Sequence, residues 1–135
     1  MECLFCSWLE KKNQILWENE NIVVFVANLA FTEGHVLVVP KKHVESIFEI
    51  DEKLREELFF VSLKMGKLLD EKLKIGGYTL ALNEKVYLTE PDDTTHIPHV
   101  HMHIIPRRKN EYPFSKGKRK LTEKEVKELI SILKS

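Results

Sequence analysis

Short apolar runs separated by polar turns fill the first third of the chain and predict β-strands. The runs at residues 15–17 and 22–26 flank the polar segment 18–21, which predicts a hairpin. A third run, residues 35–40, is apolar almost throughout and ends at Pro40, so we expect a strand that is buried on both faces.

Two more strands are predicted in the second half of the chain. Residues 78–82 form a short β-rich run, and residues 99–105 form another, which should stop at Pro106. The segment between them, residues 86–98, is polar and contains proline, which indicates a loop.

Two longer segments repeat apolar residues at spacings of three and four, which predicts helices. The first begins after Asp51, a favourable N-cap residue, and ends near residues 75–77. The second begins with a capping-box pattern formed by Thr122 and Glu125. A helix of one or two turns is also expected at residues 3–11. The apolar positions of the two longer helices are Leu54, Leu58, Val61, Met65, Leu68 and Leu69, and Val126, Leu129, Ile130 and Leu133.

Five short strands, one long middle helix and a late helix predict an α+β domain with an antiparallel sheet. The 135 residues include 21 Lys+Arg and 21 Asp+Glu, so the formal net charge is zero. This length fits one compact domain, residues 1–135, and excludes a (β/α)₈ barrel. Zero net charge argues against non-specific binding to nucleic acid or to an anionic membrane.

The N-terminus has no basic segment followed by an apolar stretch, so no signal peptide is expected. The longest apolar run, residues 22–27, is far shorter than a membrane span. We therefore expect a cytoplasmic protein without a membrane partner. In that reducing compartment the only two cysteines, Cys3 and Cys6, either bind a metal, are redox-active or have no chemical role.

Histidine is the residue type that stands out, because most of the six histidines lie close together in the second half of the chain. His99, His101 and His103 alternate with apolar residues, so the three imidazoles would share one face of a strand. Packing does not favour such a row, which indicates either metal ligation or nucleophilic catalysis. Asp92 and Asp93, in the upstream loop, are the nearest carboxylates for a hydrolytic metal site.

Three segments resemble the histidine triad (HIT) family. The run His99-Val100-His101-Met102-His103-Ile104-Ile105 matches the pattern His-φ-His-φ-His-φ-φ, in which φ is apolar. Residues 34–43 resemble the family's second characteristic segment, and Cys3-Leu4-Phe5-Cys6 resembles an N-terminal pair found in many bacterial and archaeal members. The resemblance covers residues 1–108 and implies a HIT-like five-stranded antiparallel sheet, with residues 109–135 as a tail and C-terminal helix.

The resemblance implies a nucleotide hydrolase or nucleotidyl transferase. It would act at the α-phosphate of a nucleoside phosphoramidate, a dinucleoside polyphosphate or a related adenylated compound, so a purine nucleotide is the expected partner. His101 resembles the nucleophile that takes the nucleotidyl group in a covalent intermediate. His103 would contact the phosphate, and His35 resembles the histidine that supports the nucleophile. Nucleic acid is not an expected partner, because the basic run at 115–120 is typical of a solvated surface.

The resemblance also implies a structural zinc ion and a homodimer. The zinc ligands would be Cys3, Cys6, His43 and His99, a closed set that would fix the N-terminus to the start of the histidine strand. His96 is an alternative to His99, because His96-x-x-His99 is also a plausible ligand pair. The homodimer would use part of the long helix and a sheet edge.

The chain differs from the family's pattern around the nucleotide. A Gly-Gln-Ser/Thr run usually precedes the triad, whereas residues 93–96 are Asp-Thr-Thr-His. Thr95 would donate its hydroxyl to phosphate there, and Asn83 resembles the amide that contacts the phosphate or leaving group. The ribose position falls on Ala27, or on Asn28 if the turn is one residue shorter. Phe25 is a candidate for the base pocket and equally a core residue.

Two alternatives stay open at this stage. The first is a zinc-stabilised nucleotide-binding module without catalysis, because the phosphate loop is altered. The second is a catalytic or storage metal site formed by the histidine row itself. The sequence leaves the substrate, the leaving group and the choice between hydrolysis and transfer undetermined.

Overall fold

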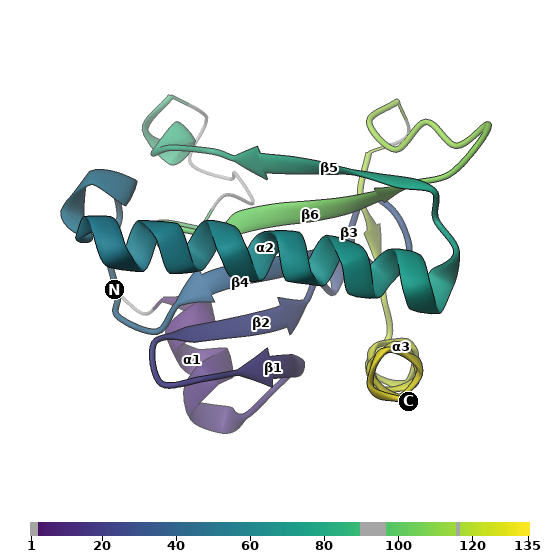
Figure 1. Cartoon of the computed structure of the whole chain (residues 1–135), viewed down its shortest axis with the longest axis horizontal. Helices are drawn as coiled ribbons and strands as arrows, with labels where there is room; N and C mark the ends of the chain where they lie inside the picture. The colour runs from purple at the N-terminus through teal and green to yellow at the C-terminus, as the bar shows by residue number, and fades with distance from the viewer. Residues whose placement is uncertain (1–2, 90–96, 116) are drawn as a thin grey trace.

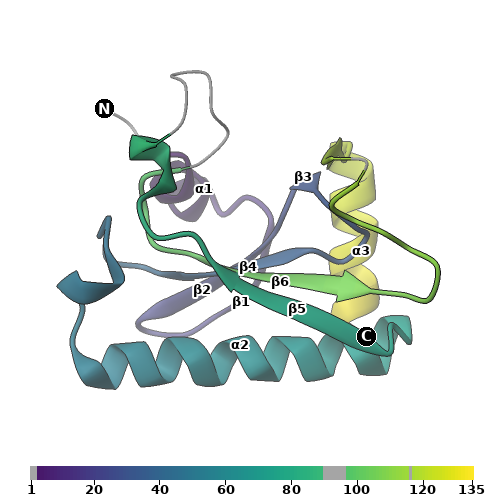
Figure 2. The same cartoon turned by 90° about the horizontal axis from the view of Figure 1, so that it is seen from above.

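The computed structural model of the chain describes residues 3–89, 97–115 and 117–135. A five-stranded sheet forms the centre of the fold (Figure 1). The long helix α2 (Glu52–Leu73) covers one face of this sheet, and the short helix α1 (Leu4–Lys11) lies on the other (Figure 2). This α+β arrangement confirms the predicted fold class.

The sheet is antiparallel throughout, with strand order β1-β2-β4-β6-β5. Its strands are β1 (Ile15–Glu18), β2 (Ile22–Val26), β4 (Val36–Pro40), β5 (Gly77–Leu82) and β6 (Met102–Arg107). The predicted hairpin is β1–β2, and β2 and β4 are buried along their whole length. Phe25, Leu37, His103 and Ala81 lie side by side across four strands, on the face opposite α2.

Helix α2 begins where the sequence predicts, because the Asp51 carboxylate accepts a hydrogen bond from the Leu54 amide at 2.8 Å. Its buried face packs on the sheet through Leu58, Val61, Met65 and Leu69. At Gly66 the helix approaches the ring of Tyr78 on β5 so closely that no side chain fits between them. This close contact sets the distance between helix and sheet at the β5 edge.

Strand β6 differs from the strand predicted at residues 99–105. It runs from Met102 to Arg107. The amide of Val100 donates to the Val44 carbonyl at 2.8 Å, so the chain before Met102 bonds to a loop and not to the sheet ladder. The strand continues past Pro106 because the ladder with β4 already ends at Ile104, so the missing N–H of proline interrupts no bond on that side.

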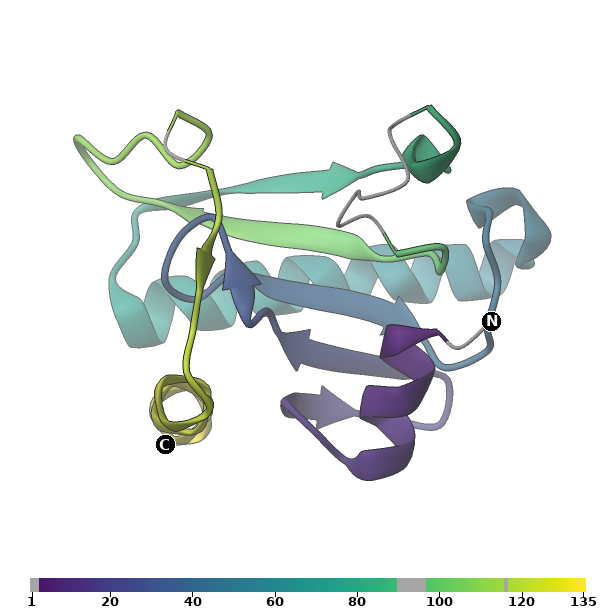
Figure 3. The same ribbon diagram turned by 180° about the vertical axis from the view of Figure 1, so that it is seen from behind.

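The C-terminal segment returns across the face of the sheet that α1 occupies (Figure 3). Two short strands, β3 (Leu29–Ala30) and β7 (Arg119–Lys120), pair there, a sheet that the sequence pattern did not predict. Helix α3 (Glu123–Lys134) follows and has the predicted capping box of Thr122 and Glu125. Two 3-10 turns, Ile47–Glu49 and Val86–Leu88, complete the described elements. In the described part of the chain, none of the helices is both long and apolar enough to span a bilayer.

Candidate functional site

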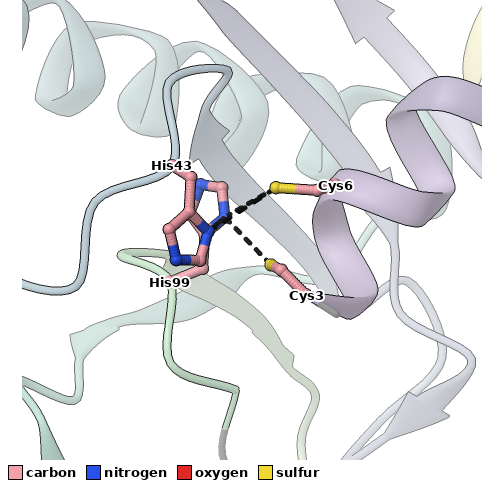
Figure 4. A group of neighbouring side chains, drawn as sticks. All are labelled: Cys3, Cys6, His43 and His99. Carbon is pink, nitrogen blue, oxygen red and sulfur yellow. Dashed lines mark hydrogen bonds between the residues drawn. The ribbon is translucent and has the colours of Figure 1, made fainter. Parts of the chain in front are cut away.

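Four potential metal ligands meet at the end of the sheet where α1 begins (Figure 4). Cys3 is the N-cap residue of α1 and Cys6 lies in its first turn, so the helix holds both thiols on one side. His43 follows the end of β4, and His99 precedes β6. The side chains come from three separate segments, yet their ligand atoms all lie within 4.8 Å of one another.

The spacing of these atoms fits a tetrahedral ion. The Nδ1 atoms of His43 and His99 are 3.2 Å apart, and the sulfur of Cys3 is 3.2 Å from His99 Nδ1. The sulfur of Cys6 is 3.5 Å from His43 Nδ1 and 3.8 Å from His99 Nδ1. Bond lengths of about 2.3 Å for Zn–S and 2.0 Å for Zn–N give ligand separations of roughly 3.3–3.8 Å in a tetrahedron. The donor set and its spacing therefore suit zinc.

The protonation of the cluster also suits a metal. His99 Nε2 lies 2.8 Å from the Pro40 carbonyl, which can only accept, so Nε2 donates and the Nδ1 lone pair faces the other ligands. Burial lowers the pKa of His99 and keeps its ring neutral. Burial, with a contribution from Cys3, raises the pKa of the Cys6 thiol to about 11, and a bound cation would favour the thiolate instead.

His101 is oriented by the backbone of His99. Its Nδ1 is 2.7 Å from the His99 carbonyl oxygen, so Nδ1–H donates and the neutral ring has its lone pair on Nε2. The edge of the ring packs against Phe5 of α1, with 5.0 Å between ring centres. His101 is buried, with 6% of its surface exposed. A buried neutral imidazole with a fixed tautomer is well suited to act as a nucleophile.

His103 has the opposite tautomer. The Phe31 amide donates to His35 Nδ1 at 3.2 Å, so the neutral ring of His35 has its proton on Nε2. That atom lies 3.0 Å from His103 Nδ1 and donates to it, which leaves the proton of His103 on Nε2. Burial is the main cause that lowers the pKa of His35 to about 3, so its ring stays neutral at neutral pH and keeps donating from Nε2 to His103. His103 can therefore donate a hydrogen bond to an anion.

A cavity of about 420 Å³ opens beside these histidines. His35, His101 and His103 lie on its wall, and both Ala27 and Asn28 reach it. Its apolar side is formed by Leu4, Phe5, Trp8, Leu29 and Leu37. A polar floor with an apolar slot of this size is typical of a small-ligand site.

The chain's similarity to known proteins agrees with this geometry. The sequence profile of the HIT domain matches residues 9–110, about three quarters of the chain. A Bacillus subtilis protein named Protein hit is 33% identical over 109 residues, which are 78% of this chain and 70% of that protein. The chain belongs to the histidine triad (HIT) family.

Solved HIT structures share the fold. A hypothetical histidine triad nucleotide-binding protein from Sulfolobus tokodaii is 27% identical, with a TM-score of 0.79 over 97% of this chain and 89% of that one. A Zn-bound histidine triad family protein from Mycobacterium smegmatis has a TM-score of 0.75 over 99% of this chain and 94% of that one. The Mycobacterium smegmatis protein is 23% identical to this chain, so the similarity supports only the shared fold.

The remaining predicted site residues of this HIT protein lie in different places. Phe25 is fully buried beneath Phe5 and Trp8, and it supports the wall of the cavity without lining it. Asn83 lines a second cavity, of about 310 Å³, together with His103. The predictions for Thr95 and His96 lie outside the described residues.

The histidine row is divided between two sites, because His99 joins the cysteines while His101 and His103 line the large cavity. In the described ranges, the cysteine–histidine cluster is the only group of three or more potential metal ligands that lie together. The geometry therefore gives no support to a metal site formed by the whole row.

Sequence reasoning missed several residues that line the cavities. Leu4, Phe5 and Trp8 share one face of α1, and their helical spacing was a signal that the sequence contained. Lys118 was predicted to be solvated surface within the basic run, yet it lines both cavities. No local pattern marks Lys118, because its position depends on the pairing of β7 with β3.

Proposed function

We propose that this HIT protein is a nucleotide hydrolase or nucleotidyl transferase that works through a covalent nucleotidyl-His101 intermediate. The supporting observation is the pair of opposite tautomers, with a lone pair on His101 Nε2 and a proton on His103 Nε2 beside one cavity. A nucleophile and a donor to the phosphate are what attack at an α-phosphate requires.

In the proposed first step, His101 Nε2 forms a bond to the α-phosphorus while the bond from phosphorus to the leaving group breaks. A polyphosphate leaves as its anion, whereas the nitrogen of a phosphoramidate takes a proton from solvent and leaves as ammonia. His103 Nε2–H donates to a phosphate oxygen and stabilises the negative charge there. In the second step, water or another nucleophilic acceptor attacks the same phosphorus, the N–P bond breaks, and the acceptor's proton is lost to solvent. His35 keeps the His103 proton on Nε2 throughout.

A purine nucleotide is the proposed ligand of the 420 Å³ cavity. The apolar slot formed by Leu4, Trp8 and Leu37 suits the flat base, and Asn28 is near enough to the slot to hold the ribose hydroxyls. Phe25 supports the slot from below, and Asn83 lies beyond His103, on the side of the leaving group. Thr95 remains a proposed phosphate contact.

Covalent labelling tests the proposed function. We expect an adenosine phosphoramidate or diadenosine polyphosphate carrying a labelled α-phosphate to leave acid-labile label on the protein. His101→Ala should remove the label, while Lys109→Ala, at an exposed position, should keep it. Binding without label or turnover would instead support the nucleotide-binding module that lacks catalysis.

We also propose that the four-ligand cluster holds a structural Zn²⁺. The donor set of two cysteines and two histidines leaves no open position for water, so the ion would hold the fold and not take part in catalysis. We propose a cytoplasmic location, because its reducing conditions would keep Cys3 and Cys6 available as zinc ligands.

The proposed assembly is a homodimer, and we propose that residues 1–135 form a single HIT domain. Strand β5 is an edge of the sheet, and Phe59 and Leu63 on the neighbouring face of α2 are 51% and 41% exposed. An edge strand beside exposed apolar side chains favours pairing with a second copy. Within the domain, Leu121 and the apolar face of α3 join the same core as the sheet.

A further inference from the structure

The C-terminal segment of this chain adds residues to the histidine site. The profile of the HIT domain ends at residue 110, and the C-terminal segment after it runs over the face of the sheet opposite α2 (Figure 3). The Leu121 amide donates to the Asn28 carbonyl at 2.6 Å, and the pairing of β7 with β3 fixes the register. Lys118, one residue before β7, is thereby brought beside the histidines.

Lys118 stands between two cavities. One is the 420 Å³ cavity with His35 and His101, and the other is the 310 Å³ cavity with Asn83. Among the described residues, only His103 and Lys118 line both. A phosphate chain that crosses from one cavity to the other must therefore pass both His103 and Lys118.

The second cavity lies where a leaving group would go. In a displacement at phosphorus, the attacking and leaving atoms stand on opposite sides of the phosphorus atom. His101, the proposed nucleophile, lines the first cavity and not the second. A group held in the second cavity would thus be attached on the side of the phosphorus atom opposite His101.

The walls of this cavity suit an aromatic group that carries phosphate. Phe31 and Phe114 meet edge to face, with 5.1 Å between ring centres. The Lys118 ammonium lies 5.2 Å from the centre of the Phe31 ring, and the Arg107 guanidinium lies 5.4 Å from that of Phe114. The two rings are exposed or partly exposed, so a nucleotide base could stack on them. The two cations beside them would neutralise the charge of the phosphates.

We propose that the 310 Å³ cavity is a leaving-group site for a nucleoside polyphosphate, in which Lys118 binds the phosphates between the two cavities and Phe31 and Phe114 hold the distal base. This inference rests on the proposed function and makes dinucleoside polyphosphates the preferred substrate class. Lys118 is a positioning and specificity-determining residue, since it binds the part of the substrate that departs.

Two substrates that share an adenosine α-phosphate test the proposal. Diadenosine tetraphosphate fills both cavities, whereas adenosine 5′-phosphoramidate has only ammonia to release. Lys118→Ala should lower kcat/KM for the tetraphosphate about ten- to a hundredfold, as expected for a charge-assisted contact, and change that for the phosphoramidate less than about threefold. Lys118→Arg should restore most of the loss, and Lys109→Ala should match the unmodified protein with both substrates.

The aromatic part of the site has its own test. Phe114→Ala should weaken turnover of diadenosine tetraphosphate more than that of adenosine 5′-tetraphosphate, which has no distal base. Equal losses on all substrates, or no loss with Lys118→Ala, would overturn the proposal, because Lys118 would then support the fold or contact only solvent.

A binding measurement separates this proposal from the proposed catalysis. In the His101→Ala background, calorimetric titration should show Lys118→Ala weakening diadenosine tetraphosphate about ten- to a hundredfold while AMP binding stays within about threefold. If the protein has no turnover but shows this pattern, catalysis is refuted and the leaving-group site is supported. If both ligands bind equally well with and without Lys118, the leaving-group site is refuted whatever the activity.

Discussion

The Nδ1 atom of His101 lies 2.7 Å from the carbonyl oxygen of His99. The side chain of His99 belongs to the cysteine–histidine cluster, whereas its backbone sets the tautomer of the neighbouring imidazole. The cluster also holds α1, whose Phe5 packs against both rings, at 5.7 Å from that of His99 and 5.0 Å from that of His101. The cysteine–histidine cluster and the proposed nucleophile are therefore linked through one residue.

Loss of the metal should consequently affect both stability and catalysis. We expect about one zinc per chain in the unmodified protein and almost none in Cys3→Ser. Because structural zinc contributes directly to folding, the melting temperature of Cys3→Ser should fall by about 10 °C or more. Elemental analysis and calorimetry measure the two quantities, and kcat for a nucleotide substrate should fall with them.

Glu10→Ala is the matched control for this prediction, because Glu10 is an exposed residue of the same helix and is not one of the four potential ligands. It should retain metal, melting temperature and activity. Metal that persists in Cys3→Ser but disappears in His101→Ala would contradict zinc binding by the cysteine–histidine cluster. It would support a metal site in the histidine row instead.

How far the site could be predicted depends on how local its signals are. Cys3 and Cys6 are one helical turn apart, so the sequence itself indicates a pair of ligands. The spacing of the triad likewise predicts that His101 and His103 share one face, and both line the same cavity. That His99 leaves the row could not be predicted from alternation. It follows from Val100 bonding to Val44 and not to β4.

The fold shows the same division. The β1–β2 hairpin, α2 and the capping box of α3 follow from periodicity and capping residues, and they occur where expected. Strands β3 and β7 are two residues each, too short to carry a periodic signal, and they pair across about 90 positions of sequence. The position of Lys118 depends on that pairing, which explains why only the structure reveals it.

The contact between Gly66 and Tyr78 makes a prediction about stability. In an exposed helix, Gly→Ala usually stabilises by about 1 kcal/mol. Here a Cβ at position 66 would overlap the Tyr78 ring, so Gly66→Ala should destabilise by about 1–3 kcal/mol. Urea unfolding measures the change. Adding Tyr78→Leu should recover part of the loss, and a stabilised single variant would show that the helix can move away from the sheet.

The exposed apolar face beside β5 predicts the oligomeric state. Phe59→Glu places a charge on the proposed dimer surface and should convert a dimer into a monomer, observed as a halved mass in sedimentation equilibrium. The control is Ile132→Glu, which places the same charge at an exposed apolar position on a different helix, α3, and should leave the dimer intact. An unmodified protein that sediments as a monomer would exclude this interface.

The buried His35 predicts how stability depends on pH. Its pKa falls from 6.5 to about 3 on folding, chiefly through burial, so between these values the unfolded chain binds a proton that the folded protein does not. The unfolding free energy should therefore decrease as the pH falls below about 6.5, by up to about 1.4 kcal/mol per pH unit from this group. His35→Gln removes the titration, so its unfolding free energy should fall less steeply between pH 6.5 and 5. The cysteine–histidine cluster is the same in both proteins, and its own pH dependence cancels in the difference. Parallel curves from denaturant unfolding at several pH values would mean that His35 accepts a proton in the folded state, and its Nδ1 could then no longer accept the hydrogen bond from the Phe31 amide.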